Sequence, residues 1–317
     1  MAEPRRIVLT GATGFIGGHI ARILLARGDE LVVFSRDPEA ARERVPGAAT
    51  YVAWQPEETG PWASEIDGAD AVIHCAAPSI FDTRYTHEYA RESLDNRVRS
   101  TRGLVRAMSE ARIRPGAFVN ASSQGIYGFG PVTDEPVDES SPVDSGYWGQ
   151  DSVPWEAAAL AAEDLGVRTV LIRTGYVLGE NGGGLPYHIG QALAGHGAVS
   201  APGDAWCSWI HIADEARLFV FALDEQTASG PLDATAPNPV RNRDYAAALA
   251  KATGRPVRMQ PYLLTRVFVG KVAEIVAHQK RVLPTKALDL GFQFRFPTID
   301  EALADLVPRI ADTTRAQ

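Results

Sequence analysis

The sequence predicts an α/β protein with a doubly wound parallel sheet, followed by a smaller C-terminal lobe. Through the first half of the chain, short apolar runs alternate with helical patterns. Near-continuous apolar strands are typical of a parallel sheet that helices cover on both faces. From about residue 173 the alternation is replaced by a glycine-rich stretch, which indicates a different architecture.

The predicted strands of the first half are rich in β-branched and aromatic residues, which favour strands. We expect them at residues 7–9, 31–34, 50–54, 71–75, 117–120 and 169–172. Apolar residues recur at helical spacing between several of these runs. Helices are therefore predicted at residues 15–27, about 90–111 and 155–165.

The second half predicts loops with one helix over residues 173–203, and a strand followed by a helix over 209–223. Further helices are expected near residues 242–253, 263–278 and 298–311. We therefore predict a first domain at residues 1–175 and a C-terminal substrate-binding lobe at 176–317. The chain is expected to return to the first domain at about residues 205–230.

Composition limits the kinds of partner that the protein can have. Hydrophobic residues make up 45% of the chain and charged residues 22%, with a net charge of -8. An acidic surface argues against nucleic-acid binding, which needs a basic face. No apolar stretch approaches the roughly 20 residues that span a bilayer. Cys75 and Cys207 form neither a disulfide framework nor a metal-ligand cluster, so we expect a cytoplasmic protein without a metal or a membrane partner.

A glycine-rich turn follows the first predicted strand and opens the first predicted helix. Gly11 permits the tight turn, Gly14 lets the backbone approach a pyrophosphate, and Gly17 allows the helix to pack closely on the strand. The pattern predicts a Rossmann domain that binds a dinucleotide at the helix N-terminus, although a turn without a ligand is the simpler alternative. The residues expected to contact the dinucleotide are Thr10, Gly11, Thr13, Gly14, Phe15, Ile16 and Gly17.

The end of the second strand predicts which dinucleotide is bound. An acidic residue there hydrogen-bonds the ribose 2′-hydroxyl of NAD, whereas an arginine accommodates the 2′-phosphate of NADP. Ser35 and Arg36 come first in this chain, and Asp37 follows them. We therefore predict that Ser35 and Arg36 bind NADP(H), with the alternative that Asp37 holds the ribose while Arg36 extends into solvent.

Motifs over nearly the whole chain resemble those of extended short-chain dehydrogenases/reductases. They are TGATGFIG, VIHCAA, VNASSQGIYG and LIRTGYVLG. PWEAAA, WCSWIHIADEA, ATAPNPVRN and QKRVLPTKALDLGFQFRFPTIDEAL are similar to the atypical "epimerase family" group within that family. The resemblance implies NADP(H) binding, a small-molecule substrate and a possible homodimer. It also implies cofactor contacts from Ala76, Ala77, Ser122, Gly175, Tyr176 and Val177.

The same family transfers hydride with a serine, a tyrosine and a lysine in a Tyr-x-x-x-Lys pair. Ser123 matches the serine, and the family spacing places the tyrosine near Tyr147. No lysine precedes Lys251, so the Tyr–Lys pair is absent. Tyr147, activated by another group, and Tyr127 are both candidate proton donors, and ordinary packing is the alternative role for each. Water or the substrate itself is the third possible source of the proton. Ser123 has the alternative role of capping a turn.

Three aromatic residues in the second half are candidates for the substrate pocket. His188 follows a glycine-rich loop that covers the substrate in extended family members. Trp206 and Trp209 flank the return to the first domain and are expected to form a pocket wall, with burial in the core as the alternative.

These features predict an NADP(H)-dependent oxidoreductase that acts on a small organic carbonyl or conjugated double bond. Two alternatives remain open from the sequence. One is an NADP-dependent epimerase, which oxidises and reduces the same centre. The other is a non-catalytic module that senses NADP(H), because a Rossmann domain without its acid–base pair can still bind cofactor.

Overall fold

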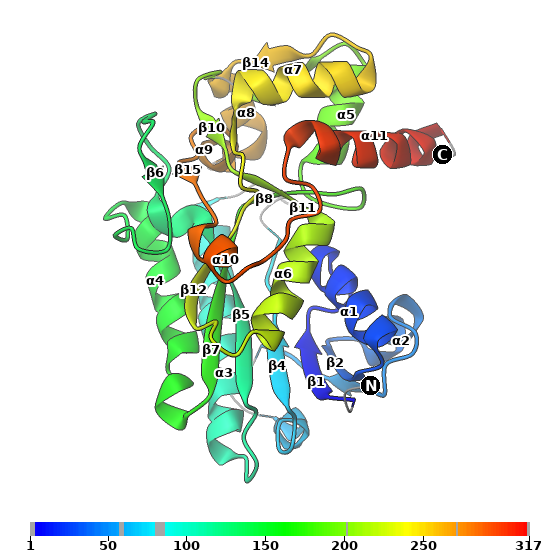
Figure 1. Cartoon of the computed structure of the whole chain (residues 1–317), viewed down its shortest axis with the longest axis vertical. Coiled ribbons are helices and arrows are strands. Elements are labelled where there is room, and N and C mark those ends of the chain that lie inside the picture. The colour runs from blue at the N-terminus through cyan, green and yellow to red at the C-terminus, as the bar shows by residue number, and fades with distance from the viewer. Residues whose placement is uncertain (1–3, 57–59, 80–85, 201, 271, 316–317) are drawn as a thin grey trace.

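The computed structural model describes residues 4–56, 60–79, 86–200, 202–270 and 272–315, and is organised around a seven-stranded parallel sheet (Figure 1). The strand order is β12-β7-β5-β4-β1-β2-β3. The sheet strands are β1 (Arg6–Thr10), β2 (Glu30–Ser35), β3 (Thr50–Ala53), β4 (Ala71–His74), β5 (Ala117–Ser123), β7 (Arg168–Thr174) and β12 (Gly230–Ala234). The order reverses between β1 and β4, and ligands of open α/β sheets bind at such a reversal, beyond the carboxyl ends of the strands.

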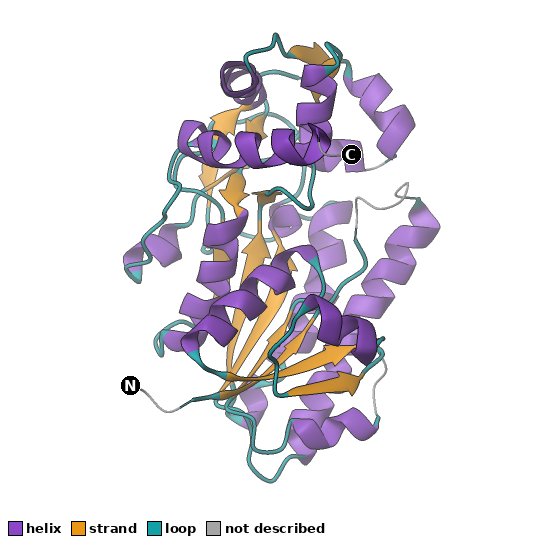
Figure 2. Cartoon of the chain, turned by 90° about the vertical axis from the view of Figure 1, so that its right-hand side faces the viewer, coloured by secondary structure: helices purple, strands orange, loops and turns teal. Residues whose placement is uncertain are grey.

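Helices cover both faces of the sheet (Figure 2). Alternate residues of the strands enter two separate cores, one on each face. In β1, Ile7 and Leu9 face the core shared with α1 (Phe15–Arg27) and α6 (Ile212–Asp224), which pack together. Val8 faces the opposite core, beside α3 (His87–Glu110) and α4 (Tyr147–Leu160). Both faces are therefore covered, and the predicted doubly wound α/β fold is confirmed.

The C-terminal lobe lies beyond the carboxyl edge of the sheet, at the top of Figure 1. Its helices are α5 (Leu185–Leu193), α7 (Asn242–Thr253), α8 (Tyr262–Val269), α9 (Val272–Ala277) and α11 (Ile299–Arg315). Two parallel strands, β9 (Gly197–Ser200) and β14 (Arg258–Gln260), pair within it. The predicted limits of the two domains stay a prediction.

Three further strand pairs connect segments that lie far apart in the sequence. β8 (Tyr176–Leu178) pairs with β11 (Trp209–His211), and β10 (Trp206–Cys207) pairs with β13 (Val240–Arg241). β6 (Pro136–Val137) pairs with β15 (Arg281–Val282). The remaining short elements are α2 (Pro38–Arg44), α10 (Thr285–Asp289) and the 3-10 helices η1 (Pro61–Glu65), η2 (Gln124–Tyr127) and η3 (Glu163–Leu165).

The helices at residues 15–27 and 242–253 have the predicted limits, whereas two other predictions are corrected. The helix expected at 155–165 is α4, which begins at Tyr147 and ends at Leu160. The helix expected at 263–278 is two helices, α8 and α9, with Gly270 after the first. The φ angle of Gly270 is 70°, which residues with a side chain rarely adopt, so glycine suits the end of α8. Within the described parts of the chain, no helix is long and apolar enough to cross a membrane.

Candidate functional site

The predicted dinucleotide loop lies where β1 and β4 diverge. Gly11 has a φ angle of 75°, and a Cβ atom there would lie 2.7 Å from the backbone nitrogen of Ala76, in the loop after β4. A Cβ atom on Gly17 would lie 2.1 Å from the carbonyl oxygen of Gly11. Both positions therefore require glycine, because neighbouring backbone atoms occupy the space of a side chain.

Buried polar side chains form hydrogen bonds that hold this loop in place. The Thr10 hydroxyl lies 2.7 Å from Nδ1 of His74 and accepts a hydrogen bond from the Ala76 backbone nitrogen at 3.2 Å. Nε2 of His74 lies 3.1 Å from the Ser100 hydroxyl, and burial lowers the pKa of His74 to about 3. Thr10 and His74 therefore join β1, β4 and α3 as a neutral, hydrogen-bonded unit.

The N-terminus of α1 fits an anionic group. The helix begins after Gly14, which makes no side-chain cap, so side chains do not cover the first backbone N–H groups. These groups and the helix dipole favour a phosphate at this position. Gly14 is exposed, and Phe15 and Ile16 are half-buried beside it. Thr13 is also half-buried.

Arg36 and Asp37, which follow β2, have different roles in the structure. The Asp37 side chain accepts a hydrogen bond from the backbone nitrogen of Ala40 at 3.0 Å and so caps α2. The Ser35 hydroxyl donates to the Asp37 carbonyl oxygen at 3.0 Å. Arg36 is exposed and has no ion-pair partner among the described residues. Its guanidinium group can therefore meet a phosphate, whereas Asp37 is already held by its own helix.

A buried polar network joins the carboxyl ends of β5, β7 and β12 to α4. The Ser122 hydroxyl donates to Glu156 at 2.6 Å, and Arg173 donates to both Glu156 oxygens at 2.9 Å. Arg173 also donates to the Tyr127 hydroxyl at 2.9 Å, and that hydroxyl contacts Asp233 at 2.8 Å. Burial and the nearby Asp233 charge raise the pKa of Tyr127 far above its usual value. Tyr127 and Ser122 therefore lie inside a paired network, in a poor position to exchange protons with a substrate.

The other two candidate hydroxyl groups are more accessible. The Ser123 hydroxyl accepts a hydrogen bond from the Gly125 backbone nitrogen at 3.0 Å and so caps η2. Capping a turn was the alternative role that the sequence offered for this serine. Tyr147 begins α4 and is 41% exposed. Partial burial and the charges of Asp151 and Glu274 raise the pKa of Tyr147. Tyr147 is therefore surrounded by acidic groups where the family pattern has a lysine.

Two of the C-terminal lysines are bound to partners other than Tyr147, whereas Lys280 is half-buried and directly follows the cavity-lining Gln279. Lys251 forms an exposed ion pair with Asp300 at 2.8 Å. The Lys286 ammonium group donates to the carbonyl oxygens of Ser229 and Pro231, beside β12. Lys271 lies outside the described residues.

A cavity of about 760 Å³ extends from the edge of the sheet into the C-terminal lobe. It is lined by Gly183 and Gly184, and a Cβ atom on Gly183 would lie 3.5 Å from the Phe15 ring at the N-terminus of α1. His188 lines the cavity as well, with Nδ1 lying 3.0 Å from the Tyr245 hydroxyl. The cavity is therefore adjacent to the predicted cofactor loop.

The two tryptophans expected in the pocket wall lie elsewhere. Trp209 is fully buried in the core and donates to the carbonyl oxygen of Asn238 at 3.2 Å. Trp209 is not among the described residues that line the cavity, so the alternative of burial in the core fits it better than a place in the pocket wall. Trp206 donates to the carbonyl oxygen of Thr133 at 2.9 Å, and the Arg241 guanidinium group lies 3.8 Å from its ring centre.

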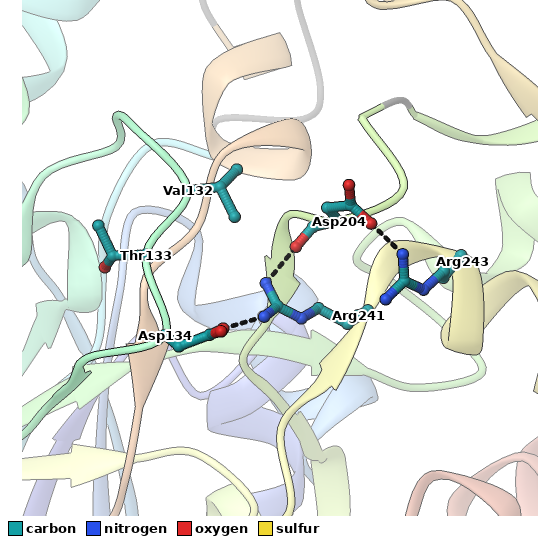
Figure 3. Close-up of a pocket in the computed structure, with 6 residues that line it drawn as sticks. All are labelled: Val132, Thr133, Asp134, Asp204, Arg241 and Arg243. Atoms are coloured by element: carbon teal, nitrogen blue, oxygen red, sulfur yellow. Dashed lines mark hydrogen bonds and ion pairs between the residues drawn. The ribbon is translucent and has the colours of Figure 1, made fainter.

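Trp206 instead adjoins a separate polar hollow, shown in Figure 3. Arg241 is paired with Asp134 and with the carbonyl oxygen of Asp204, and Arg243 is paired with the Asp204 carboxylate. These charges neutralise one another and connect three segments of the chain. Both arginines among the described residues that line the hollow are therefore already paired, so neither is left for an anionic ligand.

The remaining predicted cofactor residues lie at the same edge of the sheet but differ in exposure. Ala77 is exposed after β4, and Ala76 and Gly175 are half-buried. Tyr176 and Val177 are buried in β8, and Tyr176 lines the cavity. Their contacts with a cofactor stay predictions.

Sequence reasoning missed the residues that act through tertiary contacts. Glu156, Arg173 and Asp233 complete the buried network, and Gln279 lines the cavity. Glu156 and Gln279 both occur inside motifs that carried the family resemblance, which was the available signal. The residues that they contact lie far away in the sequence, so the motifs alone could not show what these side chains do.

Comparison with protein-family models gives two matches. The model of the "NAD dependent epimerase/dehydratase family" matches residues 7–233. A model described as a domain of unknown function (DUF1731) matches residues 261–306, which include α8, α9, β15 and α10. The first match covers the seven-stranded sheet and the segments that connect its strands. The second covers the C-terminal lobe from α8 to the first part of α11.

Relatives and solved structures resemble the chain over almost its full length. The epimerase family protein YfhF of Bacillus subtilis is 31% identical over 303 residues, or 95% of this chain and 97% of that protein. The chloroplastic SDR39U1 homolog of Arabidopsis thaliana is 33% identical and covers 94% of this chain and 85% of its own. The human SDR39U1 structure with NADPH has a TM-score of 0.83 at 27% identity, covering 96% of this chain and 99% of that one.

Proposed function

Because the chain belongs to the NAD dependent epimerase/dehydratase family, we propose that it is an NADP(H)-dependent oxidoreductase acting on a small organic carbonyl or conjugated double bond. One observation carries the proposal. The cavity of about 760 Å³ joins the region of the dinucleotide loop to the C-terminal lobe, and small-molecule sites are commonly of this size. The similar human protein has NADPH in its structure, and this supports the choice of cofactor.

The residues of this chain would share the binding of NADP(H) as follows. Backbone N–H groups of Phe15 and Ile16 would hold the pyrophosphate, since the Gly14 N–H already donates to the Gly11 carbonyl oxygen, and Arg36 with Ser35 would hold the 2′-phosphate. Ala76, Ala77 and Gly175 would border the remainder of the cofactor. When bound, NADP(H) supplies the hydride donor or acceptor.

The proton-transfer groups follow from the exposure and pKa of the candidate hydroxyls. Ser123 would orient the substrate oxygen. Tyr147 would donate a proton in the direction of reduction, since it is the exposed phenol among the candidates and a phenol is protonated near neutral pH. Its raised pKa leaves even less phenolate to act as a base, which disfavours the epimerase alternative. We assign Tyr127 to the buried network rather than to catalysis.

The acidic surroundings of Tyr147 favour a second candidate function, a non-catalytic module that senses NADP(H). Such a module would bind the cofactor at the same loop and arginine but would have no substrate step. The two candidates therefore differ in whether hydride leaves the bound cofactor.

The first experiment uses NADPH with deuterium at C4 of the nicotinamide. The purified protein is incubated with this cofactor and a panel of aldehydes, ketones, enones and imines, and the products are measured by mass spectrometry. Deuterium in a product supports the oxidoreductase. Tight NADPH binding with no deuterium in any product would favour the sensing module instead.

A pair of variants tests the active-site assignment. Ser123→Ala should abolish transfer while leaving NADPH affinity unchanged, since Ser123 is proposed to touch substrate rather than phosphate. Ser109→Ala removes an exposed hydroxyl on α3 and serves as the matched control. Full transfer in the Ser123→Ala variant would refute the proposed role of this serine.

A further inference from the structure

We propose that the substrate is an uncharged, largely apolar molecule, and that the amide nitrogen of Gln279 donates a hydrogen bond to one of its oxygen atoms. The inference rests on the proposed function and narrows its substrate class. It is carried by the orientation of one buried amide and by the charges and shape of the cavity that this amide faces.

The amide of Gln279 is held in one orientation by two donors. Its oxygen accepts a hydrogen bond from the backbone nitrogen of Ser208 at 2.8 Å and from Nε2 of Gln124 at 3.2 Å. If the oxygen and nitrogen of the Gln279 amide exchanged places, its NH₂ group would face the N–H groups of Ser208 and Gln124, and both hydrogen bonds would be lost. The oxygen is therefore committed to the protein, and the nitrogen is the group left to bind something else.

The free nitrogen faces the cavity. Gln279 lines the cavity and is only 3% exposed, and among the described residues its amide nitrogen has no hydrogen-bond partner. This nitrogen is not one of the fully buried side-chain atoms that lack a partner, so it keeps accessible surface through which an acceptor in the cavity can reach it. Gln124 directly follows Ser123, so the amide also lies close to the carboxyl end of β5, where the reacting end of the substrate is expected. This N–H group is a pre-positioned donor for a substrate oxygen.

The described, buried side chains of the cavity wall carry no charge near neutral pH, whereas the lining residues His196 and Arg258 are exposed. Burial raises the pKa of Cys207 to about 12 and lowers that of His188 to about 4. Burial also raises the pKa of Tyr176 and Tyr245 above the usual value. Among the described lining residues, Arg258 is the one permanent cation, and it is exposed. A diphosphate or dicarboxylate would lose its hydration here without enough opposite charge to replace it.

Aromatic rings form one side of the cavity and favour a flat or apolar substrate body. The His188 ring centre lies 6.1 Å from that of Tyr176 and 5.6 Å from that of Tyr245. The His188–Tyr245 hydrogen bond holds two of these rings in place. Val199, Met259 and Leu264 contribute further apolar surface. The wall therefore offers contact area, and Gln279 offers a directional polar contact.

The proposal gives a role to the segment at residues 261–306, whose family model has no assigned function. Gln279 belongs to this segment, and so do four other cavity-lining residues: Pro261, Leu264, Thr265 and Val272. The Thr265 hydroxyl is already paired with Ser200 and Gln260, so it stabilises the wall. The segment would thus close the cavity and select the substrate.

The test measures binding of two probes to the full chain saturated with NADP⁺, which has no hydride to transfer and so leaves the probes unchanged. Benzylideneacetone is a neutral conjugated ketone with an apolar ring, and UDP-glucose carries a diphosphate. We expect saturable binding of benzylideneacetone and at least about tenfold weaker binding of UDP-glucose, by isothermal titration. Equal or tighter binding of UDP-glucose at this cavity would overturn the inference with no variant needed.

Gln279→Glu tests the donor itself. The introduced carboxyl can still accept from Ser208 and Gln124, but its second oxygen replaces the N–H group. We expect benzylideneacetone to bind at least about tenfold more weakly at pH 8.5 than to the parent. Part of the affinity should return at pH 5.5, where a buried carboxyl is protonated and can donate. A purely structural defect would not recover in this way.

Gln293→Glu introduces the same charge at an exposed position of the same segment and should bind like the parent at both pH values. Parent-like binding by Gln279→Glu at pH 8.5 would overturn the role of the amide. Deuterium transfer separates this inference from the proposed function. Binding of benzylideneacetone without transfer to any compound supports the inference but contradicts the oxidoreductase. Transfer only to charged compounds, with no binding of benzylideneacetone, overturns the inference alone.

Discussion

At the scale of single residues, Arg36 and Asp37 illustrate how a neighbouring helix decides between two chemistries. A Rossmann domain can present either an acid or an arginine to the adenosine ribose. Here α2 uses the Asp37 carboxylate as its N-cap, at 3.0 Å from the Ala40 nitrogen. The cap satisfies one of the free N–H groups of the helix and so holds the acid in place. Arg36 is left as the exposed group at the end of β2.

Replacing Arg36 should therefore change the choice of cofactor. We expect Arg36→Gln to weaken NADPH binding by about 10- to 100-fold, because a charge-assisted hydrogen bond to phosphate is lost. NADH affinity should not change, since NADH lacks the 2′-phosphate. Arg44→Gln removes the same charge from an exposed position at the end of α2 and is the control. Dissociation constants for both cofactors, measured at one salt concentration, decide the result, and an equal loss for NADH would argue against the assignment.

At the scale of elements, the position of α1 depends on how closely the helix packs against the loop that precedes it. The chain turns at Gly11, and the first turns of α1 then lie against this loop. A Cβ atom on Gly17 would lie 2.1 Å from the Gly11 oxygen, whereas one on Gly18 would lie 3.5 Å from the Ala12 oxygen. Two adjacent glycines in the same helix therefore have different structural requirements.

This difference predicts opposite effects for two matched substitutions. Gly17→Ala should lower the free energy of unfolding by about 1–3 kcal/mol, because the helix must move away from the loop. It should also weaken NADPH binding. Gly18→Ala should be neutral or stabilise by up to about 1 kcal/mol through helix propensity. Urea unfolding of both variants tests the prediction, which fails if the two changes are equivalent.

The start of α4 shows a limit of local pattern reading. Apolar spacing predicted a helix that begins at residue 155, directly after Pro154. In the structure Pro154 lies inside a helix that begins at Tyr147. Contacts from outside the helix hold this first part in place. Trp148 donates to Glu274 at 2.7 Å and packs with Val272, both from α9. The tertiary contacts thus outweigh the local signal.

At the scale of the whole molecule, buried ionisable groups make stability depend on pH in two directions. Burial lowers the pKa of His19 and His188 to about 4 and that of His74 to about 3, from 6.5. Below pH 6.5 the unfolded chain therefore takes up protons that the folded chain does not, and stability falls as the pH falls. Burial raises the pKa of Glu215 from 4.5 to about 8, so its contribution is lost as the pH rises between those values.

Glu215 is fully buried, and its Oε1 accepts a hydrogen bond from the Thr174 hydroxyl at 2.8 Å. We expect the parent to lose stability between pH 6.5 and 8, where the histidines no longer titrate. Glu215→Gln should reduce this loss by up to about 1.4 kcal/mol per pH unit. Urea unfolding across this range tests the prediction, with the exposed Glu163→Gln variant as the control. Parallel curves for Glu215→Gln and the parent would contradict it.

The sequence alone determined the parts of this protein that depend on neighbouring residues. The α/β class followed from strand and helix periodicity, and the family resemblance, now confirmed, followed from contiguous motifs. The glycine loop and the order of Ser35, Arg36 and Asp37 could likewise be read directly, since strand, turn and helix are consecutive there. These features are local because hydrogen bonds and steric limits act over a few residues.

Only the tertiary structure decided which side chains meet across the fold. Gln124 reaches Gln279, and Tyr127 reaches Asp233, from opposite parts of the chain. Trp209 belongs to the core rather than the pocket for the same reason, since its surroundings come from several distant segments. Burial also sets the charge of a side chain, and burial is not a property of a motif. A sequence pattern names the chemical groups, whereas packing determines which of them remain free to act.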